Sequence, residues 1–189
     1  MKILSICGSP RKGNSETILL ELQRLFKEKD INNELVLLRE KNINRCHGCV
    51  EFCNPAGICC QKDDVSLIID KMIESDGLII ISPNYFQMPP GLLKDFMDRT
   101  CVIFSSGKDK LLKNKKVAII AVGAEKAEES EVCAQNIAKL YCRYVGKVVV
   151  TKSFQTKSEL KGNFNDIFEN GLNPDIHTSL NSIVEALLK

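Results

Sequence analysis

The chain has 189 residues, of which 44% are hydrophobic and 26% charged, a balance typical of a soluble globular protein. This length suits a single domain over residues 1–189. The formal net charge is +2 and the basic residues are scattered, which argues against a nucleic-acid or membrane-surface partner. The first apolar run, Lys2–Cys7, is too short for a signal-peptide core, and no stretch reaches the ~18 apolar residues of a membrane helix, so we expect a cytoplasmic protein.

Short apolar runs alternate with stretches of helical periodicity along the chain. The runs predict five strands: Lys2–Cys7, Glu34–Leu38, Gly77–Ser82, Lys116–Val122 and Lys147–Thr151. The periodic stretches predict helices that carry Ile18–Phe26, Val65–Ile73, Leu92–Met97, Val132–Val145 and Ile176–Leu187. Gly77–Ser82 is apolar without a break, as expected of a central parallel strand covered on both faces. The alternation predicts a flavodoxin-like three-layer α/β/α sandwich with a five-stranded parallel sheet in the order 2-1-3-4-5.

Two segments fit this alternation poorly, Ser105–Asn114 and a polar excursion at 153–173. The polar excursion at 153–173 is long for a loop in a compact domain, and such loops are often lids, oligomer contacts or ligand covers. The alternative is a short helix around Asp166–Glu169. Earlier in the chain, Asp63 or Asp64 is expected to cap the second helix.

The loop after the first strand is the first candidate site. In this sheet order a ligand lies beyond the carboxyl ends of the strands, between the loops after strands 1 and 3. Residues 8–17 read Gly-Ser-Pro-Arg-Lys-Gly-Asn-Ser-Glu-Thr and lead directly into a helix, whose N-terminus favours a phosphate. The side chains able to bind it are Ser9, Arg11, Asn14, Ser15 and Thr17. The alternative is a plain turn in which Asn14 or Ser15 caps the helix.

Three motifs resemble those of the NAD(P)H-dependent FMN reductases and the iron–sulfur flavoproteins, a family of the flavodoxin-like superfamily. They are Gly-Ser-Pro-Arg-Lys-Gly-Asn-Ser at 8–15, Ser-Pro-Asn-Tyr-Phe at 82–86 and Leu-Lys-Asp-Phe-Met-Asp-Arg at 93–99. The similarity extends from Met1 to about Gly123. Three such motifs in order and at the family's spacing are a specific signal.

The resemblance implies a complete FMN site. The phosphate would be held by Ser9, Arg11, Asn14, Ser15 and Thr17. The flavin ring would be bordered by Pro83, Asn84, Tyr85 and Phe86, and by a third loop that begins at Gly123. No catalytic side chain is implied, because the flavin itself carries the chemistry. Asp98 and Arg99 are expected to stabilise the end of their helix.

Five of the nine cysteines lie between Cys46 and Cys60. An odd number of cysteines in a reducing compartment argues against structural disulfides and suggests a metal or redox role. The resemblance implies a [4Fe–4S] cluster near the flavin edge, in a cysteine-rich loop at 45–62, with the ligands Cys46, Cys49, Cys53 and Cys59. The sequence departs from the family spacing, since three residues rather than two separate Cys49 from Cys53. Cys60 is then a spare thiol.

Two alternatives to the cluster remain open. A zinc ion could take three or four of these thiolates, or His47. The loop could instead be a set of thiols without a metal, some of them buried as small apolar side chains. The remaining cysteines are expected to pack in the core or against helices: Cys7, Cys101, Cys133 and Cys142. His177 is expected at the surface, without a role.

The resemblance implies an FMN-dependent oxidoreductase, a flavin reductase-like enzyme that passes electrons from NAD(P)H through bound FMN to an acceptor. The alternative is an iron–sulfur flavoprotein that acts as an electron carrier, with a [4Fe–4S] cluster beside FMN. A zinc-binding or redox-sensing module without flavin is a third possibility, and it leaves residues 8–17 unexplained. The resemblance also implies a homodimer or homotetramer, because the family builds flavin sites at subunit contacts.

Overall fold

A computed structural model describes residues 1–156, 165–168 and 174–189. Its sheet has five strands in the order β2-β1-β3-β4-β5, and all neighbouring strands are parallel. The strands are β1 (Lys2–Cys7), β2 (Asn32–Leu37), β3 (Gly77–Pro83), β4 (Lys116–Gly123) and β5 (Lys147–Gln155). This is the flavodoxin-like order, so the predicted fold class is confirmed.

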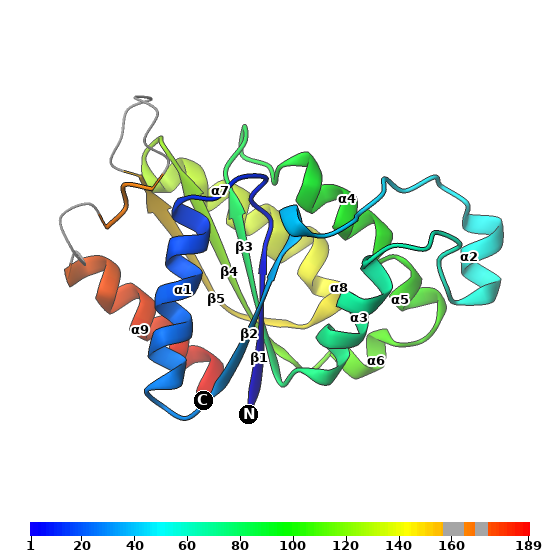
Figure 1. The fold of residues 1–189 in the computed structure, drawn as a ribbon, viewed down its shortest axis with the longest axis horizontal. Helices are drawn as coiled ribbons and strands as arrows, with labels where there is room; N and C mark the ends of the chain where they lie inside the picture. The colour runs from blue at the N-terminus through cyan, green and yellow to red at the C-terminus, as the bar shows by residue number, and fades with distance from the viewer. Residues whose placement is uncertain (157–164, 169–173) are drawn as a thin grey trace.

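Helices cover both faces of the sheet (Figure 1). The α-helices are α1 (Asn14–Lys27), α2 (Val50–Ala56), α3 (Val65–Glu74), α4 (Gly91–Arg99), α5 (Val102–Ser105), α6 (Asp109–Leu112), α7 (Ala127–Asn136), α8 (Arg143–Val145) and α9 (Pro174–Leu188). A short 3-10 helix, η1 (Leu38–Glu40), follows β2, and a π-helical segment, η2 (Ile137–Cys142), joins α7 to α8. None of the described helices is both long and apolar enough to cross a membrane.

Each face of the sheet carries its own hydrophobic core. Alternate residues of β3 point to opposite faces, so that Leu78 and Ile80 join the core under α3 to α8, while Ile79 and Ile81 join the core under α1 and α9. All four are at most 1% exposed, and each contributes roughly 1.5–3 kcal/mol by its burial. This two-sided burial explains the unbroken apolar run of the central strand.

Some element boundaries differ from the predicted ones. β5 continues to Gln155 because Phe154 is buried in the core with α9, so the first residues of the predicted excursion belong to a strand. The helix predicted from Val132 begins five residues earlier, at Ala127, with two glutamates in its first turn, where acidic residues are favourable. Within the excursion, Ile167 and Phe168 form a turn and Asp166 is in no helix. The last residue of the alternative short helix, Glu169, lies outside the described residues.

Candidate functional site

The candidate site lies where the strand order reverses, between β1 and β3. Figure 1 shows the loops after these two strands at the same edge of the sheet. The Gly8 N–H donates to the Ile81 carbonyl at 2.8 Å, and the Asn84 N–H donates to the Val122 carbonyl at 2.7 Å. Main-chain hydrogen bonds therefore link the first loop to β3 and the second loop to β4, as the predicted crevice requires.

The first loop presents an uncapped helix N-terminus. α1 begins after Gly13, and no side chain caps it; the alternative in which Asn14 or Ser15 caps the helix is therefore wrong. Ser9 is buried, and its hydroxyl donates to the Arg11 carbonyl at 2.7 Å, which shapes the loop. The N–H groups of the first helical turn have no acceptor within the helix. Together with the helix dipole they form a site for an anion.

Two of the predicted phosphate donors have other partners. The Asn14 amide nitrogen donates to Asp166 Oδ1 at 2.9 Å, and its amide oxygen accepts the Ile167 N–H at 2.9 Å. The Thr17 hydroxyl donates to Asn165. Both side chains therefore hold residues 165–168 against the start of α1. Of the polar groups of Asn14, only the backbone N–H then remains to bind a phosphate. Nothing in the sequence singled out Asp166, which is fully buried.

A partly buried cation lies beside the first turn of α1. Arg39, from η1, places Nη2 3.0 Å from Glu16 Oε2. Its Nη1 is buried and has no hydrogen-bond partner among the described residues. A buried donor without an acceptor is costly. Glu16 and Glu40 already pair with Nη2, so Nη1 is the atom that could donate to an anion in the loop. The chemistry of the loop therefore fits a phosphate group.

The second loop has a strained tip. Tyr85 and Met88 exchange two main-chain hydrogen bonds of 3.0 and 3.1 Å, and the residues between them, Phe86 and Gln87, have φ angles of 53° and 62°. Two central residues with positive φ are typical of a type I′ turn, which normally uses glycine or asparagine. Such strain costs about 1–3 kcal/mol per residue and is concentrated at functional sites. The Phe86 side chain is fully exposed, at 101%, so its ring is available to a ligand.

The third loop begins at Gly123, which adjoins the second loop. A Cβ atom at this position would lie 3.2 Å from Asn84 Cβ and would collide with the Ser130 hydroxyl oxygen. The lack of a side chain at Gly123 therefore lets the end of β4 lie close to Asn84 and to Ser130 of α7. The structure places Gly123 beside Asn84, and the role of both residues at a flavin ring stays a prediction.

The cysteine-rich loop is closed at its base by a set of hydrogen bonds. We call residues 42–45 and 61–64 the loop neck. Asn42 and Asp64 form two hydrogen bonds, of 2.7 and 3.0 Å, and the Gln61 amide donates to the Arg45 carbonyl at 2.8 Å. The loop therefore leaves and re-enters the fold at one place. It projects past α4, away from the loop after β1 (Figure 1). The position of its cysteines relative to the flavin edge stays a prediction.

A buried ion pair fixes the neck to α4. Arg99 donates to both carboxylate oxygens of Asp63, at 2.6 and 2.9 Å, and to the Asn44 carbonyl at 2.9 Å. The side chains of Arg99 and Asp63 are 1% and 0% exposed. Burial raises the pKa of Asp63, but hydrogen bonds from Arg99 and from two backbone N–H groups outweigh it and leave that pKa lowered. Arg99 was expected to stabilise its own helix end; it holds the cysteine-rich loop instead.

The thiols of the loop divide into two groups. Cys53 is buried and lies against Cys101, at the junction of α4 and α5. Burial and the nearby thiols of Cys53 and Cys46 raise the pKa of Cys101 to about 11. On the other side of the loop, the sulfurs of Cys49 and Cys60 are 3.6 Å apart. Cys101 therefore belongs to this region, although the sequence predicts only packing for it; its place two residues after Arg99 was the available signal.

The thiols of the cysteine-rich loop are candidate metal ligands by their chemistry. Within the part of the chain that the structure describes, no three histidine, cysteine, aspartate or glutamate side chains are positioned to hold a metal ion. Thiolates suit iron–sulfur and zinc sites, and a cluster or a zinc ion in this loop stays a prediction. The remaining cysteines pack as predicted, since Cys7, Cys133 and Cys142 are all fully buried.

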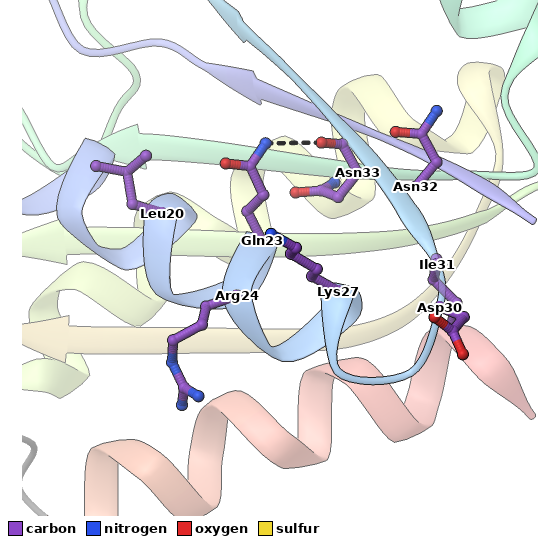
Figure 2. Close-up of a pocket in the computed structure, with 8 residues that line it drawn as sticks. All are labelled: Leu20, Gln23, Arg24, Lys27, Asp30, Ile31, Asn32 and Asn33. Carbon is purple, nitrogen blue, oxygen red and sulfur yellow. Dashed lines mark hydrogen bonds between the residues drawn. The ribbon is translucent and has the colours of Figure 1, made fainter.

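A separate groove lies along the outer side of α1. Figure 2 shows that Gln23 and Arg24 line it from α1, while Asn32 and Asn33 line it from β2. The Gln23 amide donates to the Asn33 carbonyl at 2.8 Å, which satisfies part of the edge of the sheet. The groove begins at the amino end of β2, whereas the candidate site lies at the carboxyl ends of the strands. It therefore contributes nothing to that site.

Comparison with known proteins gives two kinds of relatives. The model of a family described as NADPH-dependent FMN reductase matches residues 1–158. An iron–sulfur flavoprotein of Methanocaldococcus jannaschii is 36% identical over 142 residues, which are 75% of this chain and 72% of that protein. An iron–sulfur flavoprotein of Methanosarcina thermophila is 33% identical over 138 residues, 72% and 71% of the two chains.

Solved structures resemble the fold at low sequence identity. FerB, a flavoenzyme NAD(P)H:(acceptor) oxidoreductase from Paracoccus denitrificans, superposes with a TM-score of 0.66 at 16% identity, over 98% of this chain and 94% of that one. Flavodoxin 1 from Bacillus cereus gives a TM-score of 0.60 at 14% identity, over 99% and 97% of the two chains. At such identities the likeness establishes the flavodoxin-like fold alone.

Proposed function

Because this chain belongs to the NADPH-dependent FMN reductase family, we propose that it is an oxidoreductase that binds FMN in the crevice between the loops after β1 and β3. When bound, FMN would accept a hydride and would release electrons one or two at a time. The observation that carries the proposal is the uncapped N-terminus of α1 beside the buried Nη1 of Arg39, a pair of features that suits the phosphate.

The residues of the crevice have separate tasks in this proposal. The N–H groups of the first turn of α1 bind the phosphate, with Ser15 and Arg11 as side-chain donors. Asn14 and Thr17 hold residues 165–168 over the start of the helix. Pro83, Asn84, Tyr85 and Phe86 lie along the ring, and the exposed aromatic groups exclude water from it. Gly123 leaves space for the ring edge beside Asn84.

The first test is a titration of flavin-free protein with FMN, in which the quenching of flavin fluorescence measures binding. Arg11→Ala is expected to raise the Kd about tenfold or more, since a hydrogen bond to a charged group is lost. Lys12→Ala is the matched control, because Lys12 is an exposed cation next to Arg11, and its Kd should change less than about threefold. Equal effects of the two substitutions, or no FMN binding by the unmodified chain, would refute the phosphate site.

We also propose NAD(P)H as the reductant, with support from the family description and from no residue of this chain. Bleaching of bound FMN by NADH or NADPH under anaerobic conditions tests this step. A flavin that binds tightly but is not reduced by either nucleotide would refute NAD(P)H dependence while leaving the FMN site intact. We also propose that the protein is a cytoplasmic homodimer or homotetramer. The molar mass in solution tests the oligomeric state.

An electron carrier with a [4Fe–4S] cluster is the second candidate function. The observation that favours it is the name of the relatives, which are iron–sulfur flavoproteins at up to 36% identity with coverage above two thirds of both chains. Iron and sulfide analysis of anaerobically purified protein, with zinc measured in the same sample, distinguishes a cluster, a zinc site and a metal-free thiol loop.

A further inference from the structure

We propose that Cys49 and Cys60 form a dithiol site that reacts with small-molecule disulfides and closes to an intramolecular disulfide. Their sulfurs are 3.6 Å apart, although the residues are eleven positions apart in the chain. Neither the family motif nor the sequence analysis pairs these two residues. The proposal concerns the cysteine-rich loop alone and does not depend on FMN binding.

The fold already brings the two thiols together. Cys49 is the N-cap of α2, and its carbonyl accepts the Cys53 N–H at 3.0 Å. Cys60 adjoins Gln61, whose amide is bonded to the loop neck. A disulfide has an S–S bond of about 2.05 Å, so the sulfurs need to approach each other by about 1.5 Å. The conformational entropy of closing this loop is already lost when the chain folds, so the oxidation does not have to overcome it.

Access to the pair is open, whereas the neighbouring thiols have other contacts. Cys60 is exposed and Cys49 half-buried, so a small reagent can reach either sulfur. Cys53 is buried against Cys101. The Cys46 sulfur accepts the Gly48 N–H at 3.5 Å. The folded loop therefore holds Cys49 and Cys60 as two accessible thiols in contact.

The reaction is a thiol–disulfide exchange in two steps. One protein thiolate attacks a sulfur of the small disulfide, which forms a mixed disulfide and releases the first small thiolate. The second protein thiolate then attacks the protein sulfur of that mixed disulfide and releases the second. Cys49 and Cys60 together lose two electrons, the small disulfide gains them, and the two protein protons end on the released thiols. Because metals bind the thiolate, the closed pair cannot supply Cys49 as a ligand.

The test uses the full chain, purified anaerobically with its iron content recorded, and glutathione disulfide as the probe. After incubation the remaining thiols are alkylated, and the protein is digested with trypsin and a glutamate-specific protease. Cleavage after Arg45, Glu51 and Lys62 separates Cys49 from Cys60. The expected product is fragment 46–51 linked to fragment 52–62, with tandem mass spectrometry placing the bond between Cys49 and Cys60.

Three serine variants complete the test. Cys60→Ser is expected to abolish the linked product, whereas Cys59→Ser, one residue away, and Cys101→Ser should retain it. A link that persists in Cys60→Ser, fragments that are alkylated without any link, or glutathione adducts that never resolve would each overturn the proposal. The wild-type spectrum decides the question even if a variant fails to fold, because it identifies the linked sulfurs directly.

Discussion

The ion pair of Arg99 and Asp63 shows what one buried contact does for a surface loop. Removing one partner of such a pair leaves a buried charge without compensation, which costs about 3 kcal/mol. We therefore expect Asp63→Asn to lower the free energy of unfolding by about that amount in urea titrations. Asp98→Asn is the control, because Asp98 pairs with Lys94 on the surface of the same helix, and its loss should cost less than about 0.5 kcal/mol. Equal losses would contradict the assigned role of Asp63.

The same carboxyl group predicts how stability depends on pH. The pKa of Asp63 is lowered in the folded protein, whereas in the unfolded chain it is about 3.9. A lowered pKa gives stability that is complete above the unfolded value and is lost as the pH falls through the folded value. The difference in unfolding free energy between wild type and Asp63→Asn should therefore be constant above about pH 5 and shrink at lower pH. A difference that already vanishes near neutrality would contradict this linkage.

The sequence predicts which single residues are important better than it predicts which residues they contact. Asn14, Thr17 and Asp63 were all recognised as polar residues at helix starts, and Asp63 does accept the Val65 N–H there. Their stronger contacts are with residues far along the chain: Asp63 with Arg99 at 36 positions and Asn14 with Asp166 at 152. No local pattern encodes such pairs, because they depend on how separate elements pack.

The approach of α4 to the end of β1 is the contact between elements on which the crevice depends. A Cβ atom at Gly8 would lie 2.6 and 2.7 Å from two atoms of Leu93. Gly8→Ala is therefore expected to push α4 away and to cost about 1–3 kcal/mol of stability, with weaker FMN binding, measured by denaturation and by fluorescence titration.

Gly91→Ala provides the control for this substitution. Gly91 is the first residue of α4, and a Cβ atom there meets nothing within 4 Å. Alanine should be neutral or stabilise the helix by up to about 1 kcal/mol. If both alanine variants behave alike, the close packing of Gly8 against Leu93 does not limit the position of the loop.

The sequence predicts a helix or a strand correctly where many side chains of that element are buried. β3 and α9 were predicted from an unbroken apolar run and a periodic apolar face, and both patterns report burial directly. β5 was predicted too short, because polar residues flank the single buried side chain of Phe154. α2 was missed, since a seven-residue helix in a cysteine-rich loop has few apolar residues, and its position depends on contacts with α5.

The molecule as a whole separates two groups of functional residues. The crevice follows from topology, because parallel strands in this order place their loops together, and three loops of the predicted FMN site therefore meet. The cysteine-rich loop is not constrained by the sheet. Its place at the end of the molecule, past α4 (Figure 1), depends on the neck and on Arg99, and the sequence alone therefore could not show which thiols pair.

Ligand binding at the crevice should be visible in the stability of the whole chain. A ligand at about 100 times its Kd raises the free energy of unfolding by about 2.7 kcal/mol, which for a chain of this size shifts the Tm by roughly 5–10 °C. We expect FMN to produce such a shift in a thermal melt. Riboflavin at the same concentration carries the same ring without the phosphate, so it should produce only a small shift if the N-terminus of α1 is the main anchor. Equal shifts would instead assign the binding energy to the ring contacts at Tyr85 and Phe86.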